Sequence, residues 1–273
     1  MKFISYSIDK INHIGVVKNN KVYKTKYSSI YELFNVDLSK VVILEEELDN
    51  YKEEPIIKYP NQDILCIGMN YYEHKEECIN AGFDDSKNLV SVYFSKRCNE
   101  AITNGCLIDL HQDLTSFPDY EGELGVVIKK DIKNATNEKD IKDSIFGYII
   151  VNDISARDLQ KTHQQFYFGK SLDTFTVISS VIITADEFED FPKLDLKTYV
   201  NNSLRQHNNT GNMIFSIPYL IKEFSSGCTI KSGTIISTGT PSGIGKSINK
   251  PLKNGDVVRV EIEKIGYIEN RCK

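Results

Sequence analysis

The sequence predicts an α+β fold that is mostly β, with a mixed sheet folded over on itself. Two observations favour it, and the chain length bounds the number of domains. From Val90 onward, short runs of β-forming residues bounded by glycine or polar turns dominate the chain. Predicted helices are few and short, and the regular strand–helix alternation of doubly wound folds is missing. With 273 residues, the chain is long enough for one large domain and a small one.

Residues 1–58 are expected to form a small N-terminal β-rich domain, and residues 63–273 a larger domain. The first segment holds two strand-like pieces, "MKFISYSI" and "NHIGVVKNNKVYKT", and the second piece should fold as a hairpin over its "KNN" turn. The charged stretch "EEELDNYKEE" and Pro60 mark a linker, so the boundary is placed there.

The larger domain begins with a strand in "ILCIGMN", which leads into a helix over "YYEHKEECINAG". Asn70 is expected to cap this helix, Glu73 occupies the acidic position of a capping box, and Gly82 is placed to end it. Further strands are expected in "ELGVVIKK", "IFGYIIVND", "TFTVISSVIIT" and "GTIISTG".

Three more short helices are expected in the larger domain. They cover "NEKDIKDSI", "SARDLQKT" and "SIPYLIKEF". Ser155 and Asp158 have the spacing of a capping box for the second of these, and Ser216 with Pro218 has the pattern of a helix start for the third.

Charge and composition narrow the classes of partner. The formal net charge is −5 and no run of lysine and arginine appears, which argues against nucleic acid or an anionic membrane and favours a small-molecule ligand. No signal peptide and no apolar stretch of spanning length is evident, so a cytoplasmic protein is expected. The six cysteines form no C-x-x-C pair, which predicts reduced, mostly buried thiols rather than a zinc or redox site.

The stretch "DYEGELGVV" carries two acids in a predicted strand. Because side chains alternate along a strand, Glu121 and Glu123 share one face, while Leu124 starts the apolar row on the other. Like charges side by side destabilise a sheet unless water or a cation offsets them, so an exposed strand face and a cation site are both open. Asp153 ends another predicted strand and adds a third acid. Carboxylates alone favour Mg²⁺, with Mn²⁺ as the alternative.

Two further groups are candidates for chemistry. His74 and Glu77 stand three apart on one helical face, where a carboxylate can hold the imidazole tautomer and raise its basicity; an ordinary surface histidine is the alternative. Lys170 lies among aromatic and β-branched neighbours, so it either reaches out to water or binds an anion.

The glycine-rich segment "GTPSGIGKS" resembles a phosphate-binding loop but fails its register. Thr240 stands where that loop needs glycine, and Pro251 interrupts the helix that should follow. A turn of this kind after a strand can still bring backbone N–H groups, beginning at Gly239, and the Thr240 hydroxyl to a ligand oxygen.

Seven segments, in order, resemble the fumarylacetoacetate hydrolase family from about Ile64 to Arg271. They are "GMNYYEHKEE", "DYEGELGVVI", "GYIIVNDISARDLQ", "FGKSLDTF", "NNTGNMIFSIPYLI", "GTIISTGTPSGIG" and "LKNGDVVRVEIEKIGYIENR". The resemblance implies a mixed β-roll fold and a homodimer. Asn202 stands where the family usually has glycine, and residues 79–90 follow no subfamily pattern, so the substrate stays open.

The resemblance also implies roles for the candidate residues. It implies that the metal ligands are Glu121, Glu123 and Asp153, and that the catalytic dyad is His74 with Glu77. It also implies that Lys170 binds the substrate carboxylate or an oxyanion, and that the substrate contacts are Lys96, Gly239 and Thr240. The favoured reaction is Mg²⁺-dependent C–C hydrolysis of a 2,4-dioxo acid of the acylpyruvate type. The alternatives are decarboxylation, tautomerisation or isomerisation of a 2-oxo dicarboxylate such as oxaloacetate or 2-hydroxyhepta-2,4-diene-1,7-dioate, and, more distantly, a non-catalytic binding module.

Overall fold

The computed structural model describes residues 1–44, 46–80 and 90–273. Its large sheet runs in the order β3 (Lys21–Lys24), β2 (Ile11–Lys18), β1 (Lys2–Ile8), β13 (Val181–Thr184), β10 (Ile145–Asp153), β9 (Gly122–Ile128), β16 (Ile235–Ser237), β5 (Ile64–Gly68) and β6 (Val92–Lys96). Beside this path, β12 (Thr176–Ile178) pairs with β10 and β4 (Lys52–Glu53) pairs with β1.

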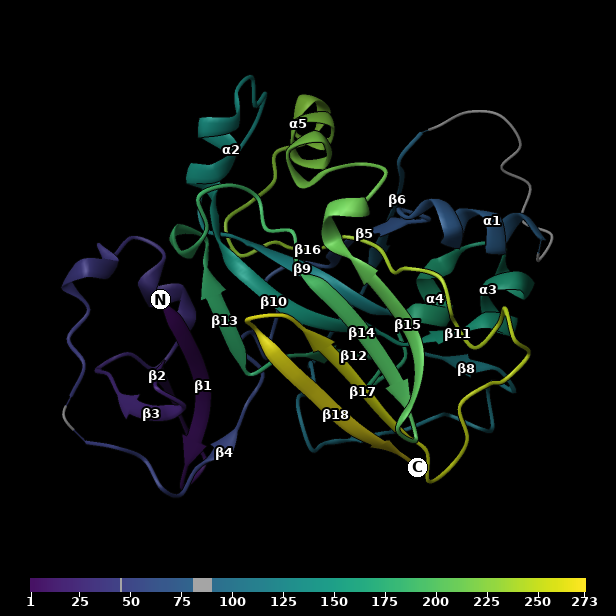
Figure 1. Ribbon diagram of the computed structural model, residues 1–273, viewed down its shortest axis with the longest axis horizontal. Coiled ribbons are helices and arrows are strands. Elements are labelled where there is room, and N and C mark those ends of the chain that lie inside the picture. The colour runs from purple at the N-terminus through teal and green to yellow at the C-terminus, as the bar shows by residue number, and fades with distance from the viewer. Residues whose placement is uncertain (45, 81–89) are drawn as a thin grey trace.

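A second sheet covers the middle of the first (Figure 1). Its order is β15 (Ser203–Asn209), β14 (Asp195–Val200), β17 (Val257–Ile262), β18 (Gly266–Cys272) and β7 (Leu107–Ile108). The short strands β8 (Pro118–Asp119) and β11 (Ser155–Ala156) form a separate pair. The pairs β16–β5 and β18–β7 are parallel and the other strand pairs are antiparallel, so the expected mixed, mostly β architecture is confirmed.

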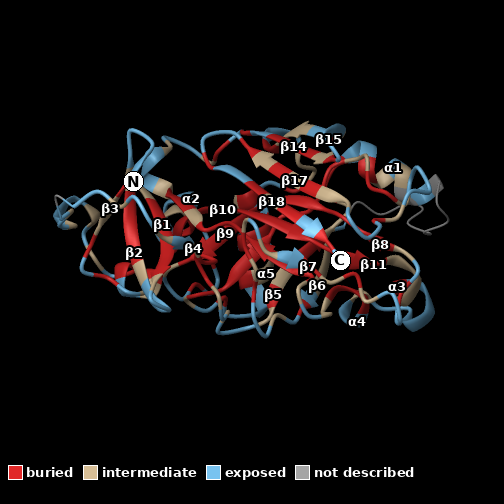
Figure 2. Cartoon of the chain, turned by 90° about the horizontal axis from the view of Figure 1, so that it is seen from below, coloured by how far each residue is buried: buried red, intermediate tan, exposed pale blue. Residues whose placement is uncertain are grey.

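Helices are short and lie around the sheets. They are α1 (Tyr72–Asn80), α2 (Glu138–Ser144), α3 (Arg157–His163), α4 (Phe166–Lys170) and α5 (Ile217–Gly227), with the 3-10 turns η1 (Ile30–Leu33), η2 (Leu38–Lys40), η3 (Ala185–Glu187) and η4 (Thr210–Asn212). The helices α1, α3 and α4 gather at one end of the molecule, opposite β1 to β3 (Figures 1 and 2). None of the helices in the described residues is long and apolar enough to span a bilayer.

Both faces of β9 and β10 are buried, as the red central strands of Figure 2 show. On one face, Leu124 and Val126 pack against Val260 of the second sheet. The sheets approach closely at Gly122, where a Cβ atom would lie 2.3 Å from the Thr198 hydroxyl oxygen. On the other face, Val127 joins a core with residues of the N-terminal segment.

The N-terminal strands extend the large sheet. The hairpin of β2 and β3 is confirmed: Asn19 and Asn20 take φ values of 52° and 61°, which asparagine tolerates in a two-residue turn. Strand β1 pairs with β13, and the Ile56 amide donates to the Ser179 carbonyl, so the segment before Pro60 packs on the large sheet. The division into residues 1–58 and 63–273 stays a prediction.

Two of the predicted helix caps are wrong. The side chain of Asn70 bonds Phe215 and the Thr238 carbonyl rather than the first turn of α1. The Ser155 hydroxyl donates to the Asp153 carbonyl, and α3 begins after Ala156 without a side-chain cap. At Asn70 a tertiary contact replaces the local one, whereas Ser155 bonds a carbonyl two residues earlier in the chain instead of the helix.

The third predicted cap, at Ser216, has the expected position but not the expected hydrogen bond. Ser216 occupies the N-cap position of α5, and Pro218 stands in its first turn, but no side-chain capping bond forms. Gly82, the expected end of α1, lies outside the described residues, as does most of the 79–90 segment.

Two further expectations need correction. The predicted strand "TFTVISSVIIT" is two strands, β12 and β13, separated at Ser179 and Ser180. Of the cysteines that the structure describes, Cys66 and Cys272 are buried, whereas Cys98 and Cys106 are partly exposed and Cys228 is exposed. The thiols are free, as expected, but they are not mostly buried.

Candidate active site and metal centre

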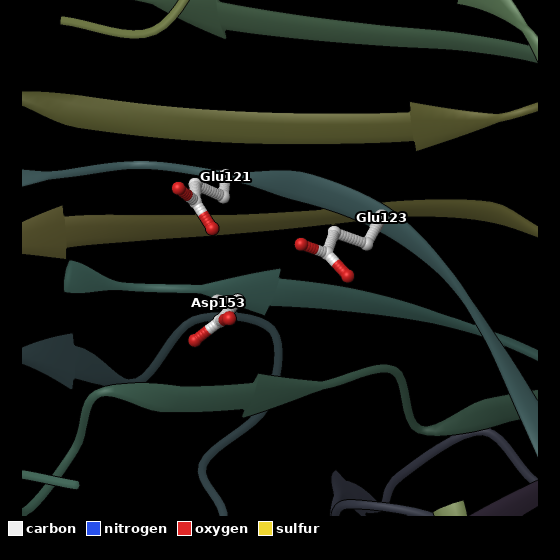
Figure 3. Close-up of side chains that lie close together, drawn as sticks. All are labelled: Glu121, Glu123 and Asp153. Atoms are coloured by element: carbon white, nitrogen blue, oxygen red, sulfur yellow. The ribbon is translucent and has the colours of Figure 1, made fainter. Parts of the chain in front are cut away.

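Three carboxylates meet where β9 begins and β10 ends. Glu121 precedes β9 by one residue, Glu123 lies on β9, and Asp153 ends β10, whose amide at Asp153 donates to the Glu121 carbonyl at 2.8 Å. One oxygen from each carboxylate lies within 4.8 Å of the other two. Figure 3 shows the three side chains gathered around a common space. Their exposed fractions are 5%, 2% and 0%, so Glu121 and Glu123 do not form an exposed strand face.

Buried cations surround these acids. The Nζ atom of Lys170, at the end of α4, lies 2.6 Å from Glu121 Oε2 and 2.5 Å from Asp153 Oδ2. Lys96, at the end of β6, donates to Asp153 Oδ1 at 2.5 Å and to the carbonyls of Ile154 and Phe175. Lys170 therefore binds anions inside the protein and does not reach out to water.

The environment separates the pKa values of the two glutamates. Burial opposes ionisation of Glu121, but the charges of Lys170 and Arg157 outweigh burial and hold its pKa at about 2. For Glu123, burial and then the charges of Asp153 and Glu121 raise the pKa to about 8. The cations that the protein supplies thus leave Glu123 without full charge compensation.

This arrangement fits a divalent cation. The donor set is three buried carboxylates with no sulfur or imidazole among the clustered ligands, which suits a hard ion such as Mg²⁺ or Mn²⁺. The Glu123 Oε2 atom accepts hydrogen bonds from the Ser237 hydroxyl at 2.6 Å and the Gly239 amide at 2.8 Å, which fixes the orientation of this carboxylate. The acidic triad can therefore hold a metal.

The predicted dyad lies beside the triad. On α1, His74 Nδ1 lies 3.3 Å from Glu77 Oε2, and His74 is 4% exposed, so it is not an ordinary surface histidine. The other Glu77 oxygen accepts the Gly243 amide at 2.9 Å. Burial alone would raise the pKa of Glu77, but its bonds to His74 and Gly243 hold that pKa below its usual value. Glu77 is thus an ionised group placed to orient the imidazole.

A pocket of about 60 Å³ joins the dyad to two acids of the triad, Glu121 and Glu123, while Asp153 is not among its described lining residues. Its lining includes six of the residues predicted from sequence: His74, Glu77, Glu121, Glu123, Lys170 and Thr240. Apolar walls come from Ile67, Met69, Phe94, Phe166 and Ile244. Segments distant in sequence therefore form one site, whose walls could enclose the carbon chain of a small acid.

Three predicted site residues, Lys96, Gly239 and Thr240, make hydrogen bonds to other groups of the site. Lys96 is not among the described lining residues and its contacts hold Asp153. Gly239, with φ 97°, places its amide on Glu123, and a side chain there would approach Asn70 to 2.8 Å. The Thr240 hydroxyl donates to the Gly122 carbonyl at 2.9 Å. The catalytic, substrate-binding and metal-binding roles of the nine residues stay predictions.

Sequence reasoning missed Arg157 and Asp119. Arg157 pairs with Glu121 through Nη1 at 2.7 Å and with Asp119 through Nε at 2.8 Å. Its Nη2 atom is buried and has no hydrogen-bond partner among the described residues, and the side chain lines the pocket. Asp119 ends β8 two residues before Glu121, and this spacing in the sequence could have revealed it. Arg157 lay in a segment interpreted only as a helix start.

The segment Gly239 to Ser247 is a wall of this pocket. No helix follows it within residues 239–273, all of which the structure describes, so it lacks the architecture of a phosphate-binding loop. Its amides bond carboxylates instead: Gly243 donates to Glu77, and Gly245 donates to Asp119 at 2.7 Å.

Comparison with known proteins identifies the family of the chain. The sequence profile of the fumarylacetoacetate (FAA) hydrolase C-terminal family matches residues 63–273. The chain belongs to the fumarylacetoacetate hydrolase family. The family assignment made from the seven segments is therefore confirmed, and this is a family of enzymes.

Several relatives have names that state an activity. Oxaloacetate tautomerase YisK of Bacillus subtilis (strain 168) is 41% identical over 226 residues, which cover 82% of this chain and 74% of that protein. A solved fumarylacetoacetate hydrolase, EaFAH from psychrophilic Exiguobacterium antarcticum, is 33% identical with a TM-score of 0.85, covering 100% of this chain and 99% of that one. The 2-hydroxyhepta-2,4-diene-1,7-dioate isomerase of Mycobacterium marinum is 25% identical with a TM-score of 0.80 and covers 100% and 98%.

Proposed function

We propose that this protein is a Mg²⁺-dependent tautomerase of a small 2-oxo dicarboxylic acid, with oxaloacetate as the first substrate to test. The observation that carries the proposal is a pocket lined both by the His74–Glu77 pair and by Glu121 and Glu123, two acids of the buried triad that Asp153 completes. The likeness to an oxaloacetate tautomerase at 41% identity favours tautomerisation over hydrolysis, which the sequence alone had placed first.

The size of the pocket supports a small substrate. Its volume of about 60 Å³ corresponds to roughly four to six water molecules. We favour oxaloacetate over the isomerase substrates because the relative that is 41% identical is an oxaloacetate tautomerase.

The metal centre supplies the first part of the chemistry. An ion held by Glu121, Glu123 and Asp153 would draw electrons from the 2-oxo group of a chelated acid and so make the neighbouring C3 proton easier to remove. Mg²⁺ is proposed on the donor set, with Mn²⁺ as the alternative.

The protein side chains move the proton and balance the charge. His74, oriented by Glu77 at 3.3 Å, takes a proton from C3 of the keto form, and the C2 oxygen of the resulting enolate takes up a proton from solvent to give the enol. In the reverse direction the enol hydroxyl gives its proton to solvent and His74 returns a proton to C3. Lys170 and Arg157 offset the negative charge that develops on the oxygen during this transfer. The unpartnered Arg157 Nη2 atom is placed to bind a substrate oxygen.

The direct test is the decay of the enol form of oxaloacetate, followed by its ultraviolet absorbance. Wild-type protein with Mg²⁺ is expected to accelerate the decay, EDTA to abolish the acceleration, and re-added Mg²⁺ to restore it. His74→Ala should lose the acceleration, whereas His207→Ala, which alters an exposed histidine on β15, should keep it. Wild-type protein that leaves the decay at its spontaneous rate with Mg²⁺ and with Mn²⁺ would refute the proposal.

Acylpyruvate hydrolysis is the second candidate. The same His74–Glu77 pair could take a proton from a water whose oxygen adds to the distal carbonyl; the C3–C4 bond then breaks to give pyruvate and a carboxylic acid. The 33% identity to a fumarylacetoacetate hydrolase supports this reading. Coupling pyruvate formation to lactate dehydrogenase separates the reactions, because acetylpyruvate yields pyruvate by hydrolysis and oxaloacetate yields it by decarboxylation, whereas tautomerisation yields none.

The cellular setting is part of the same proposal. We propose a cytoplasmic homodimer without nucleic-acid or membrane partners, on the family membership and the net charge of −5. Light scattering coupled to size-exclusion chromatography would contradict the dimer by giving the monomer mass of 31.1 kDa.

A further inference from the structure

The backbone of Gly122 joins two acids of the triad, Glu121 and Glu123. Since a residue has two soft backbone dihedrals, the conformation at Gly122 determines how the two carboxylates lie relative to each other. Two side chains hold that backbone. The Gly122 amide donates to Gln206 Oε1 at 3.1 Å, and the Gly122 carbonyl accepts the Thr240 hydroxyl at 2.9 Å.

Gln206 is a fully buried residue of β15, in the second sheet. Its side-chain nitrogen donates to the Thr240 hydroxyl oxygen and to the Pro241 carbonyl, both at 2.8 Å. The orientation of the amide is fixed, because the Gly122 amide needs an acceptor and the Pro241 carbonyl needs a donor. Gln206 therefore joins β9 to the chain that follows β16.

The Thr240 hydroxyl completes a closed ring of hydrogen bonds with Gly122 and Gln206. A hydroxyl has one hydrogen to donate, and here it is donated to the Gly122 carbonyl, while the oxygen accepts from Gln206. That hydrogen is used within the protein and is not available to a substrate oxygen. The contacts of the hydroxyl thus favour a role in holding β9.

A β-bulge in β15 lies directly before Gln206. The pairing of β15 with β14 shifts register there, with Arg205 as the additional residue. Bulges redirect the side chains beside them and are frequent next to active sites. The same bulge contacts the support of the dyad: a Cβ atom at Gly243 would lie 1.9 Å from the Arg205 carbonyl oxygen, and the Gly243 amide donates to Glu77.

We infer that Gln206 is a positioning residue of the metal centre, which holds the two glutamates at the spacing that a divalent cation needs. This inference rests on the proposed function, since it assumes that the acidic triad binds the ion. Gln206 is not among the described residues that line the pocket, so it acts through the ligands and not on the substrate. Outer hydrogen-bond partners of metal ligands typically change metal affinity by about 10- to 100-fold.

Calorimetric titration with Mg²⁺ tests the inference without turnover. Gln206→Met removes all three bonds and keeps the side-chain length, so it should weaken Mg²⁺ binding by about 10-fold or more. Asn270→Leu is the matched control, because Asn270 is also a buried amide of the second sheet and donates to the carbonyls of Thr103 and Cys106. Both variants should unfold at lower urea concentration in EDTA, whereas only Gln206→Met should lose Mg²⁺ affinity.

Thr240 variants give an independent measurement of the same ring. Thr240→Val should weaken Mg²⁺ binding, and Thr240→Ser, which keeps the hydroxyl, should recover most of it. The Gln206→Met and Thr240→Val double variant should lose less Mg²⁺ affinity than the two single losses combined, because both changes break one hydrogen-bond network. Thr240→Val that binds Mg²⁺ normally but oxaloacetate weakly would show a substrate contact and contradict the positioning role.

Two outcomes at Gln206 overturn the inference. One is a Mg²⁺ dissociation constant in Gln206→Met within about 2-fold of the wild-type value, and the other is an equal loss of affinity in Asn270→Leu. Wild-type protein that binds Mg²⁺ without accelerating the decay of the enol refutes the proposed function, and the binding comparison still decides the role of Gln206. Wild-type protein that binds neither Mg²⁺ nor Mn²⁺ refutes the metal centre and this inference together.

Discussion

The ammonium of Lys170 lies 2.5 Å from Asp153 Oδ2 and 2.6 Å from Glu121 Oε2, so one buried cation bridges two of the three proposed metal ligands. Lys170 thereby neutralises charge that a divalent ion would also neutralise. The Lys170 ammonium and a metal ion would therefore compete electrostatically for the same two carboxylates. The proposed chemistry nevertheless needs both of them.

Lys170→Met should therefore separate metal binding from turnover. Without the ammonium, the site is more negative, so we expect Mg²⁺ to bind several-fold more tightly while kcat falls by about 100-fold or more. Calorimetric titration with Mg²⁺ and the enol-decay assay measure the two effects. Weaker Mg²⁺ binding in this variant would show that Lys170 organises the acids more than it opposes the ion.

Glu123→Ala should lose both Mg²⁺ binding and activity, whereas His74→Ala should lose activity alone. Removing a proposed ligand should weaken Mg²⁺ binding by about 100-fold or more and abolish activity together. Removing His74 should abolish activity but leave the Mg²⁺ dissociation constant within about 3-fold, because the imidazole lies outside the acidic triad. Calorimetry on both variants gives the comparison, and loss of Mg²⁺ binding in His74→Ala would contradict the assigned roles.

The raised pKa of Glu123 predicts a pH-dependent stability of the metal-free protein. Its pKa is about 8 in the folded state and about 4.3 in an unfolded chain, so between these values the folded state binds more protons. The free energy of unfolding should therefore fall as pH rises from about 5 to 8, by on the order of a few kcal/mol. The depressed pKa of Glu121 acts in the opposite direction, but only below about pH 4.5.

Urea unfolding in EDTA at several pH values measures this slope. Saturating Mg²⁺ should reduce it, because the ion stabilises the ionised carboxylate, and Glu123→Gln should remove it. A metal-free protein of constant stability from pH 5 to 8 would contradict the pKa assignment.

Gly122→Ala should damage stability and metal binding together. The new methyl group would meet the Thr198 hydroxyl oxygen at 2.3 Å and Val260 at 3.0 Å, so the two sheets must separate or β9 must shift between Glu121 and Glu123. We expect a loss of about 1–3 kcal/mol in the free energy of unfolding, together with weaker Mg²⁺ binding. Gly227→Ala at the end of α5 is the control, since nothing lies within 4 Å of its Cβ position. Equal effects in both variants would refute the sheet-contact explanation.

Much of the large sheet could be predicted because its strands are recognisable from their own short stretches of sequence. The β-rich runs of β9 and β10, and the asparagine turn of β2 and β3, carry their own signals. The second sheet was missed from residue patterns alone because its strands, such as "DLKTYV" and "SLRQHNN", are largely polar and partly exposed. Their assignment depends on pairing partners that lie far away in sequence.

The acidic triad could be suspected from residue type, but its convergence could not be derived from spacing. Asp153 meets Glu121 only because β9 and β10 pair antiparallel in the observed register. The helix caps failed for a related reason. Asn70 and Ser155 have the right local pattern, but the side chain of Asn70 bonds backbone groups distant in sequence, and the Ser155 hydroxyl bonds the Asp153 carbonyl just before it.

The pairing of β1 with β13 has a consequence for any shortened form of this chain. A protein cut to residues 63–273 would lose β1, and the backbone groups of β13 that now bond it would become an unprotected sheet edge. The apolar side chains that now pack against Phe3 and Ile14 would meet water at the same place. Such a fragment, even with every proposed catalytic residue present, would be prone to self-association through that edge.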